Sequence, residues 1–374
     1  MLALLLSACG GGVRPSPDGG SGAAPPVPPP PVASAGYIDD GADHGGRAPY
    51  LFSFLHEDAS VVDAAFFAMM ERWSDAMNFT LVESVFGGDG RSAVGVLDEL
   101  SDAGVDGVVI SASGDDLTVT NNYCNELGIP HVYVFNAPRG ADGGALAPCV
   151  EIDMSAVGGF MVDWLDAHAR KAWGEEYIPE KTGVIRTRRD DDSKLAAISE
   201  GVSLRARELY PETGGNMADA SPSGGELTAE TAYNAVYMAI ITYRGADRWL
   251  IPCVSVEFGR GAAAAAETLG VSDKVAILSV EMEAVFALWD GSDAGVPGAA
   301  VAIESPANAG AALAGLIALR DGRAEPDALW SELKRPGDVC AVFTGRLRAV
   351  TRDEYADYRQ YIGSLVEKQE AGRK

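Results

Sequence analysis

The chain has 374 residues, of which 47% are hydrophobic, and this is enough to build two domains of ordinary size. Its formal net charge is −25, and so acidic a surface repels nucleic-acid phosphates and anionic lipid headgroups, so no nucleic-acid partner is expected. The five cysteines form no C-x-x-C pair and the four histidines show no ligand spacing, so the sequence predicts no metal site and no other cofactor.

The N-terminal segment has the features of an exported, lipid-anchored protein. An apolar run at 1–8 ends in small residues, and Leu6 to Cys9 (LSAC) resembles the lipobox of bacterial lipoproteins. This resemblance implies that 1–9 is a signal, that Cys9 is lipidated, and that the lipid is the only membrane attachment. Because no basic segment precedes the short run, we expect the natural signal to begin upstream. Residues 10–48, rich in Gly, Pro and Ser, are predicted to be a disordered linker.

The first globular unit alternates strands and helices with short connections, which predicts a parallel sheet with right-handed crossovers. Its strands are predicted at 50–55, 79–85, 108–110, 131–135 and 148–152. Its helices are predicted at 60–77, at 91–103 and through the four turns that end at Leu127, where Gly128 and Pro130 stop the helix.

The second unit repeats this pattern. Its strands are predicted at 182–187, 249–254, 274–279 and 298–303. Its helices are predicted at 154–173, 193–209, 228–243, 260–269, 281–288 and 306–319, with a Gly/Pro/Ser-rich loop at 212–225.

One stretch of the first unit carries a family resemblance. The sequence AGVDGVVIS at 103–111, a polar turn, and LGIPHVYVFN at 127–136 resemble the type 1 periplasmic binding proteins, the sugar-binding components of ABC importers. The same fold serves lac-repressor-like regulators, but the acidic charge argues against that branch. The resemblance covers about 49–320. It implies an α/β fold of two doubly wound parallel-sheet lobes, joined by a hinge of three crossings, with a ligand cleft between them.

The resemblance also divides the chain. The first lobe is expected to comprise 49–150 plus 305–335, and the second lobe 151–304 plus 336–362, with 363–374 as a tail. The three crossings are expected near Glu151, Glu304 and Pro336.

Ligands of open α/β sheets bind beyond the carboxyl ends of the strands. In the first lobe this rule and the resemblance select Ser60, Asp63, Ser111, Asp115 and Asn136. Ser60 and Asp63 stand where the family carries an aromatic pair, and Asp63 could equally cap its helix. Arg139 follows Asn136 and could replace an arginine that the family has nearby.

In the second lobe the candidate ligand residues are Arg188, Ser255, Glu257, Glu281 and Glu304. The last four occupy or adjoin places where the family carries polar ligand residues. Arg188 belongs to a charge cluster that a solvated loop would also explain. Glu281 and Glu304 could also be ordinary acids at helix starts.

The sequence shows no nucleophile–base set, P-loop or G-x-G-x-x-G motif, so an enzyme is not expected. We expect an extracytoplasmic, monomeric binder that takes a sugar or polyol and delivers it to an ABC transporter permease. A cationic ligand, such as an amino sugar or a polyamine-like compound, is the rival within this class. The alternative function is a membrane-tethered sensor for a chemoreceptor or histidine kinase.

Four cysteines remain after Cys9, in a compartment where disulfides are permitted. Their positions allow two pairings, Cys124 with Cys149 and Cys253 with Cys340. The alternative is four buried free thiols, which behave as small apolar residues.

Overall fold

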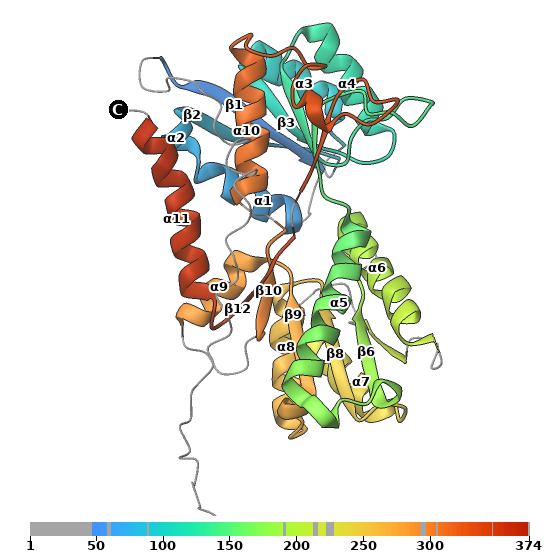
Figure 1. Ribbon diagram of the computed structural model, residues 1–374. Coiled ribbons are helices and arrows are strands. Elements are labelled where there is room, and N and C mark those ends of the chain that lie inside the picture. Colours follow the sequence, from blue (N-terminus) through green and yellow to red (C-terminus); the bar gives the residue numbers. More distant parts are fainter. Residues whose placement is uncertain are drawn as a thin grey trace, which may run out of the picture.

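The computed structural model describes residues 47–57, 61–87, 90–189, 192–211, 216–221, 228–291, 297–303, 306–345 and 347–372. In these ranges the chain forms two lobes, one above the other in Figure 1, and each lobe is built on a six-stranded sheet. The predicted fold class of two parallel-sheet α/β lobes is confirmed. Among the described elements no helix is long and apolar enough to cross a membrane.

The sheet of the first lobe has the order β11-β5-β4-β3-β1-β2, and its pairings are all parallel. Its strands are β1 (Tyr50–Glu57), β2 (Phe79–Phe86), β3 (Gly107–Ser111), β4 (His131–Phe135), β5 (Cys149–Glu151) and β11 (Val342–Thr344). Its helices are α1 (Val61–Glu71), α2 (Ser74–Met77), α3 (Ala93–Asp102), α4 (Asp116–Leu127) and α10 (Pro306–Arg320).

Side chains of β3 alternate between the two faces of this sheet, as the pleat requires. Val109 joins the apolar core under α1 and α10, whereas Val108 and Ile110 join the core under α3 and α4. The sheet is therefore buried on both faces, which explains the continuous apolar run of this strand in the sequence.

The sheet of the second lobe has the order β12-β10-β9-β8-β6-β7, and only β12 is antiparallel to its neighbour among the described strands. Its strands are β6 (Thr182–Thr187), β7 (Met217–Ala220), β8 (Arg248–Cys253), β9 (Val275–Ser279), β10 (Ala299–Val301) and β12 (Ala349–Thr351). Its helices are α5 (Met154–Trp173), α6 (Ser193–Leu209), α7 (Ala229–Thr242), α8 (Val256–Thr268) and α9 (Met282–Asp290), and α11 (Tyr355–Gly372) follows β12. Short 3-10 turns lie at Gly174–Glu176, Pro179–Lys181, Ser272–Lys274 and Ser331–Leu333.

Helices α5 and α6 cross unusually closely, because a glycine stands on each side of the contact. A Cβ atom on Gly158 would lie 2.0 Å from the carbonyl oxygen of Ile198, and a Cβ on Gly201 would lie 1.9 Å from that of Ser155. Only glycine permits such an approach of two backbones. The crossing fixes the N-terminal turns of both helices beside each other, and these turns face the first lobe.

The chain passes between the two sheets three times: from β5 to α5, from β10 to α10, and from β11 to β12. The third passage differs from the expected position near Pro336. Val342 to Thr344 pair with Cys149 to Glu151 of the first sheet, so the chain leaves the first lobe only after Thr344. The buried apolar side chains of Val342 and Phe343 hold this strand in the first lobe.

Two other expectations need correction. The predicted loop at 212–225 contains β7, which pairs with β6 at the edge of the second sheet. The predicted tail at 363–374 continues α11 as far as Gly372. This helix begins beside α9 of the second lobe and packs along α2 of the first, so it spans both lobes (Figure 1).

Candidate functional site

A polar cavity of about 520 Å³ lies between the two lobes. The first lobe contributes residues that follow the carboxyl ends of β3, β4 and β5, and the second contributes the first turns of α5 and α6. The lining residues are Ser113, Phe135, Asn136, Arg139, Glu151, Asp153, Met154, Ser155, Ser193, Lys194 and Ala197. Open α/β sheets bind their ligands at this position. The volume of the cavity is within the usual range for small-molecule sites.

An ion pair crosses the cleft beside this cavity. The Lys194 ammonium donates a hydrogen bond of 2.7 Å to Oδ2 of Asp63, and the two side chains are 8% and 0% exposed. Lys194 belongs to the first turn of α6 and Asp63 to the first turn of α1, so the pair joins the lobes. Burial raises the pKa of Asp63, although the charge of Lys194 opposes this shift.

Two buried polar atoms near this pair lack a hydrogen bond. Oδ1 of Asp63 and Oγ of Ser111 are both buried without a hydrogen bond of normal geometry, and Ser111 lies close enough to the carboxyl of Asp63 to lower its pKa. Because buried polar atoms nearly always have a hydrogen-bond partner, these two atoms are suited to bind a ligand hydroxyl or a water molecule.

The charges that line the cavity are balanced by their neighbours. Arg139 forms an ion pair with Glu151, and Asp153 accepts hydrogen bonds from the backbone N–H groups of Ser155 and Ala156 at 2.8 and 3.1 Å. Lys194 is paired with Asp63. Among the described residues, the cavity therefore offers many hydrogen-bonding groups, and each carboxylate of its lining has a cation or N–H partner.

Ser113 joins the site through a second acid at its rim. Its backbone N–H and its hydroxyl both donate to Oε1 of Glu57, at 2.8 and 2.7 Å. Glu57 ends β1 and Ser113 follows β3, so these bonds fix the polar turn after β3 against the neighbouring strand.

Backbone strain marks the end of β4. Phe135 has φ of 69°, which is rare for a bulky residue, and the Lys194 nitrogen lies 5.3 Å from the centre of its ring. Glu281, which follows β9 in the second lobe, has φ of 63°. Strained residues of this kind concentrate at functional sites, because the surrounding structure must hold them in place.

The structure brings some of the predicted ligand residues together. Asn136 lines the cavity. Asp63 lies beside the cavity because it is bonded to Lys194, which lines it, and Ser111 lies next to Asp63. Asp115 is exposed at the start of α4 and does not line this cavity, and Arg188 is half-buried just after β6. Ser60, Glu304 and Cys9 lie outside the described residues.

The three predicted residues of α8 and α9 make local contacts. Ser255 is buried and its hydroxyl accepts from the N–H of Phe258 at 3.3 Å, which caps α8. Glu257 pairs with Arg260 at 3.3 Å, and Glu281 accepts from the N–H of Val256 at 2.6 Å. None of the three lines the cavity described above, and their ligand role stays a prediction.

Sequence reasoning missed Lys194, Glu57 and Asp153 as parts of the site. Lys194 follows the charge cluster at 186–192, in which Arg188 was the predicted ligand residue, with a solvated loop as the alternative. The available signal was Asp192, whose carboxylate accepts from the N–H groups of Lys194 and Leu195 and thereby caps α6. This cap places Lys194 in the first turn of a helix that points at the cleft.

The proposed disulfides are absent from the structure. Cys124, Cys149, Cys253 and Cys340 are all free, buried thiols. The second pairing fails because Cys253 lies in β8 of the second lobe, whereas Cys340 precedes β11 of the first lobe and donates to the carbonyl of Leu146. The part of the chain that the structure describes also holds no cluster of His, Cys, Asp and Glu suited to a metal.

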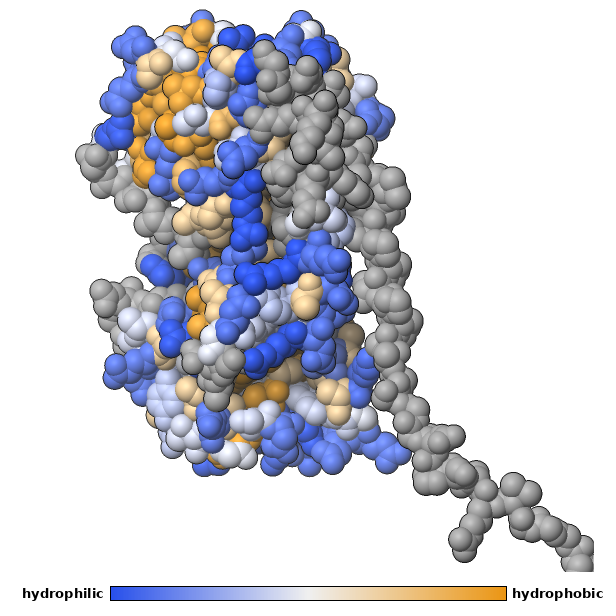
Figure 2. Space-filling model, turned by 90° about the vertical axis from the view of Figure 1, so that its left-hand side faces the viewer, coloured by the Kyte–Doolittle hydropathy of each residue, from blue (hydrophilic) through white to orange (hydrophobic). Residues whose placement is uncertain are grey.

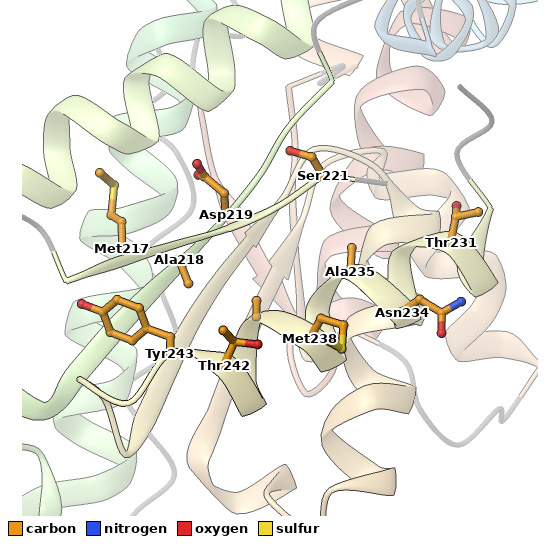
Figure 3. Close-up of a pocket in the computed structure, with 11 residues that line it drawn as sticks. Met217, Ala218, Asp219, Ser221, Thr231, Asn234, Ala235, Met238, Thr242 and Tyr243 are labelled. Carbon is orange, nitrogen blue, oxygen red and sulfur yellow. The ribbon is translucent and has the colours of Figure 1, made fainter. Parts of the chain in front are cut away.

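A larger pocket, of about 660 Å³, lies entirely within the second lobe, between the edge strand β7 and α7 (Figure 3). Figure 3 shows the side chain of Asp219 on the side of β7 away from α7. That carboxylate is held by two hydrogen bonds from Arg186, at 2.7 and 2.8 Å. The pocket draws on one lobe only, so lobe closure cannot enclose a ligand there.

No protein-family model and no curated protein sequence matches this chain. Solved structures do resemble it. An arabinose binding protein from Geobacillus stearothermophilus is 16% identical with a TM-score of 0.56, over 83% of this chain and 99% of the other. A periplasmic solute binding protein of an ABC transporter from Actinobacillus succinogenes, with bound D-allose, is 14% identical with a TM-score of 0.58, over 83% and 100%.

A carbohydrate transporter solute binding protein from Agrobacterium radiobacter, in complex with D-arabinose, is 17% identical with a TM-score of 0.56, over 86% of this chain and 100% of that one. Sequence identities this low are evidence of a shared fold, but they are no evidence of a shared ligand. The two lobes, the order of their strands and these neighbours together show that the chain has the fold of the type 1 periplasmic binding proteins.

Proposed function

We propose that this chain is an extracytoplasmic solute-binding protein that captures a small uncharged polyhydroxylated ligand, a sugar or a polyol, in the cleft between its lobes. It passes the ligand to the permease of an ABC transporter, and it acts as a binder rather than an enzyme. The observation that carries the proposal is the polar interlobe cavity with balanced charges. The three solved neighbours described above are named for arabinose or carry D-allose or D-arabinose, which supports the sugar class.

The balance of charge favours a neutral ligand over the cationic rival. Of the carboxylates at the cavity, Glu151 is paired with Arg139 and Asp63 with Lys194, while Asp153 accepts two backbone N–H groups at the start of α5, so each already has a partner before an ammonium ligand could bind it. A hydroxyl can donate to one carboxylate oxygen while accepting from a neighbouring N–H group. Asn136 can also donate and accept, so the cavity suits hydroxyls better than charges.

A thermal-shift screen of sugars, polyols, amino sugars and polyamines tests the ligand class. A ligand present at 100 times its Kd adds about 2.7 kcal/mol to the free energy of unfolding, and each kcal/mol raises the Tm of domains this large by about 2–4 °C. We expect shifts with sugars or polyols. Shifts confined to amines would contradict the proposed ligand class, and no shift with any of these compounds would contradict the binder.

Calorimetric titration with the best hit then tests the site. Asn136→Ala should weaken binding by about 10-fold, because one hydrogen bond to the ligand is worth about 0.5–1.5 kcal/mol and more when its partner is left unsatisfied. The matched control is Asn234→Ala, which removes the same kind of amide from the α7 side of the one-lobe pocket and should leave the affinity unchanged. The opposite pattern would move the site to that pocket.

The lipid anchor is a separate part of the proposal and rests on the sequence LSAC alone. Lipidation of Cys9 would hold the binding lobes at the outer face of the cell membrane, next to the permease. Labelling with a fatty-acid analogue should mark the protein when it is expressed with a full signal. Membrane association that persists in Cys9→Ser would contradict the anchor without affecting the cleft.

A further inference from the structure

The ammonium group of Lys194 lies in surroundings that suit a bound organic cation. Its nitrogen is 2.7 Å from Oδ2 of Asp63 and 5.3 Å from the centre of the Phe135 ring. A carboxylate and the face of an aromatic ring are groups by which proteins bind organic ammonium ions. The Lys194 side chain is only 8% exposed and lines the interlobe cavity. The cleft thus contains an ammonium site, and a side chain of the protein itself occupies it.

The carboxylate and the ring of this site belong to the first lobe and are held there without Lys194. Asp63 lies in the first turn of α1 and Phe135 ends β4, and both residues are fully buried. The rings of Phe66 and Phe135 pack edge to face, with their centres 5.2 Å apart. Close packing of this kind restricts the side-chain positions. Removal of the lysine side chain, which comes from the second lobe, should therefore leave the carboxylate and the ring in place.

The site also holds acceptor atoms that Lys194 does not use. Oδ1 of Asp63 and Oγ of Ser111 are buried without a hydrogen bond of normal geometry. Lys194 is tethered, because its backbone N–H donates to the Asp192 carboxylate that caps α6. A free ammonium ion also has three N–H donors but carries no tether. It can therefore shift toward the atoms that the lysine leaves without a partner.

The lysine also sets the charge that the cavity presents to a ligand. With Lys194 in place the charge of Asp63 is balanced, and the pair of Arg139 with Glu151 is balanced as well. A cationic ligand would lie beside the Lys194 ammonium, and like charges in a partly desolvated site repel. Hydrophilic residues extend across the junction between the lobes on the face shown in Figure 2, so charged solutes meet a hydrated rim there. Selection against cations is therefore expected inside the cleft.

We propose that Lys194 is the specificity-determining residue of the cleft: its side chain fills an ammonium site formed by Asp63 and Phe135, and thereby reserves the cavity for neutral ligands. This role rests on the proposed binding of a sugar or polyol. Without the lysine side chain, the same site would take a small primary ammonium ion. A purely structural ion pair would instead leave the relative affinities for neutral and cationic ligands unchanged.

Chemical rescue tests the ammonium site. Lys194→Ala removes three carbons and the nitrogen of the side chain, which are the heavy atoms of propylammonium. Propylammonium chloride at ten times its Kd should raise the Tm of this variant by about 3–6 °C over sodium chloride at the same ionic strength, because a ligand of the native state stabilises it by mass action. Propan-1-ol has the same carbon chain with an uncharged hydroxyl, and it should give no comparable shift.

Two control variants are measured in the same solutions. Lys181→Ala removes the same atoms from an exposed pair with Asp247, at 3.5 Å within the second lobe, and should show no shift. The double variant Lys194→Ala/Asp63→Asn lacks the carboxylate and should show none either. No shift in Lys194→Ala, or an equal shift with propan-1-ol, would overturn the ammonium site. If Lys194→Ala does not fold in sodium chloride, a refolding yield that is no higher in propylammonium chloride would overturn it too.

Calorimetric titration of Lys194→Gln tests the role in specificity. Glutamine keeps a hydrogen-bond donor for Asp63 but carries no charge. The probes are the best neutral sugar of the screen and the amino sugar that carries an ammonium group in place of one of its hydroxyls. The affinity for the amino sugar relative to the neutral sugar should rise by about 10- to 100-fold over the wild type, the range that one hydrogen bond to a charged group corresponds to. An unchanged ratio would overturn the role of Lys194.

The two tests separate this role from the proposed function. The rescue uses no sugar, so its failure would leave the proposed function standing. A failed sugar screen would in turn leave the ammonium site standing.

Discussion

The crossing of α5 and α6 makes a sharp prediction about stability. Gly158→Ala adds a Cβ atom 2.0 Å from the carbonyl oxygen of Ile198, whereas real Cβ atoms almost never come within 3.0 Å of another heavy atom. The obstacle is backbone, which cannot rotate away, so the helices must separate by about 1 Å. Overpacking of this kind costs about 1–3 kcal/mol and occasionally more.

The neighbouring glycine supplies the control. At Gly159 the nearest atom to an added Cβ is Cβ of Arg205, 3.9 Å away, which is an ordinary contact. Gly159→Ala therefore keeps only the gain in helix propensity, about 1 kcal/mol. We expect Gly159→Ala to be as stable as the wild type or more stable. Gly158→Ala should fall below the wild type by up to about 2 kcal/mol, because its overpacking cost is reduced by the same gain in helix propensity.

Urea denaturation followed by circular dichroism measures both variants. The two variants should differ by the overpacking cost of about 1–3 kcal/mol, which corresponds to a separation of their melting temperatures by about 2–4 °C per kcal/mol. Equal free energies of unfolding for Gly158→Ala and Gly159→Ala would refute the close crossing. The prediction concerns the site too, because the first turn of α6 carries Lys194, which would move with the helix.

Two further predictions concern titratable groups. Burial raises the pKa of Glu281 above its ordinary 4.5, and the charge of Glu257 adds to this shift, so the wild type loses stability as the pH rises through that raised pKa. The Tm of Glu281→Gln relative to the wild type should thus increase between pH 4 and pH 7, and a constant difference would contradict the burial. The thiols of Cys124, Cys149, Cys253 and Cys340 should not react with a thiol reagent in the folded protein, because burial raises the pKa of Cys340 to about 11 and of Cys124 to about 12. All four should react once the protein is unfolded, with no reductant added. Fewer than four reactive thiols in the unfolded, unlipidated chain lacking Cys9 would indicate a disulfide.

The fold was predictable because local and long-range preferences agree over most of the chain. The stretch from β3 to β4 is an example: a β-branched strand, a helix closed by Gly128 with φ of 68°, and a second strand after Pro130. β7 was missed because its sequence, Met-Ala-Asp-Ala, has no strand preference and becomes a strand only by pairing with β6. Short edge strands of this kind are set by tertiary contacts.

The site was less predictable than the fold, because its central contact is not local. Lys194 and Asp63 are 131 positions apart and belong to different lobes. Each has an ordinary local explanation, as a helix-start residue or a charge in a polar loop. The two side chains meet because of the crossing of α5 and α6 and the arrangement of the two lobes. Neither of these tertiary features is marked by a sequence motif.

The charged groups of the cleft were the part of the site that was hardest to predict from the sequence. The acids at successive strand ends predicted carboxylates in the cleft, with a sugar or polyol as the first choice of ligand and a cationic ligand as the rival. In the structure Glu257 and Glu281 turn to local partners, and the cavity lining holds two cations, Arg139 and Lys194, with two carboxylates, Glu151 and Asp153. Charges on a surface are screened beyond about 8–10 Å at physiological salt, so the distant acids contribute little here. The pairing among the described residues of the cavity supports the proposed neutral ligand over the cationic rival.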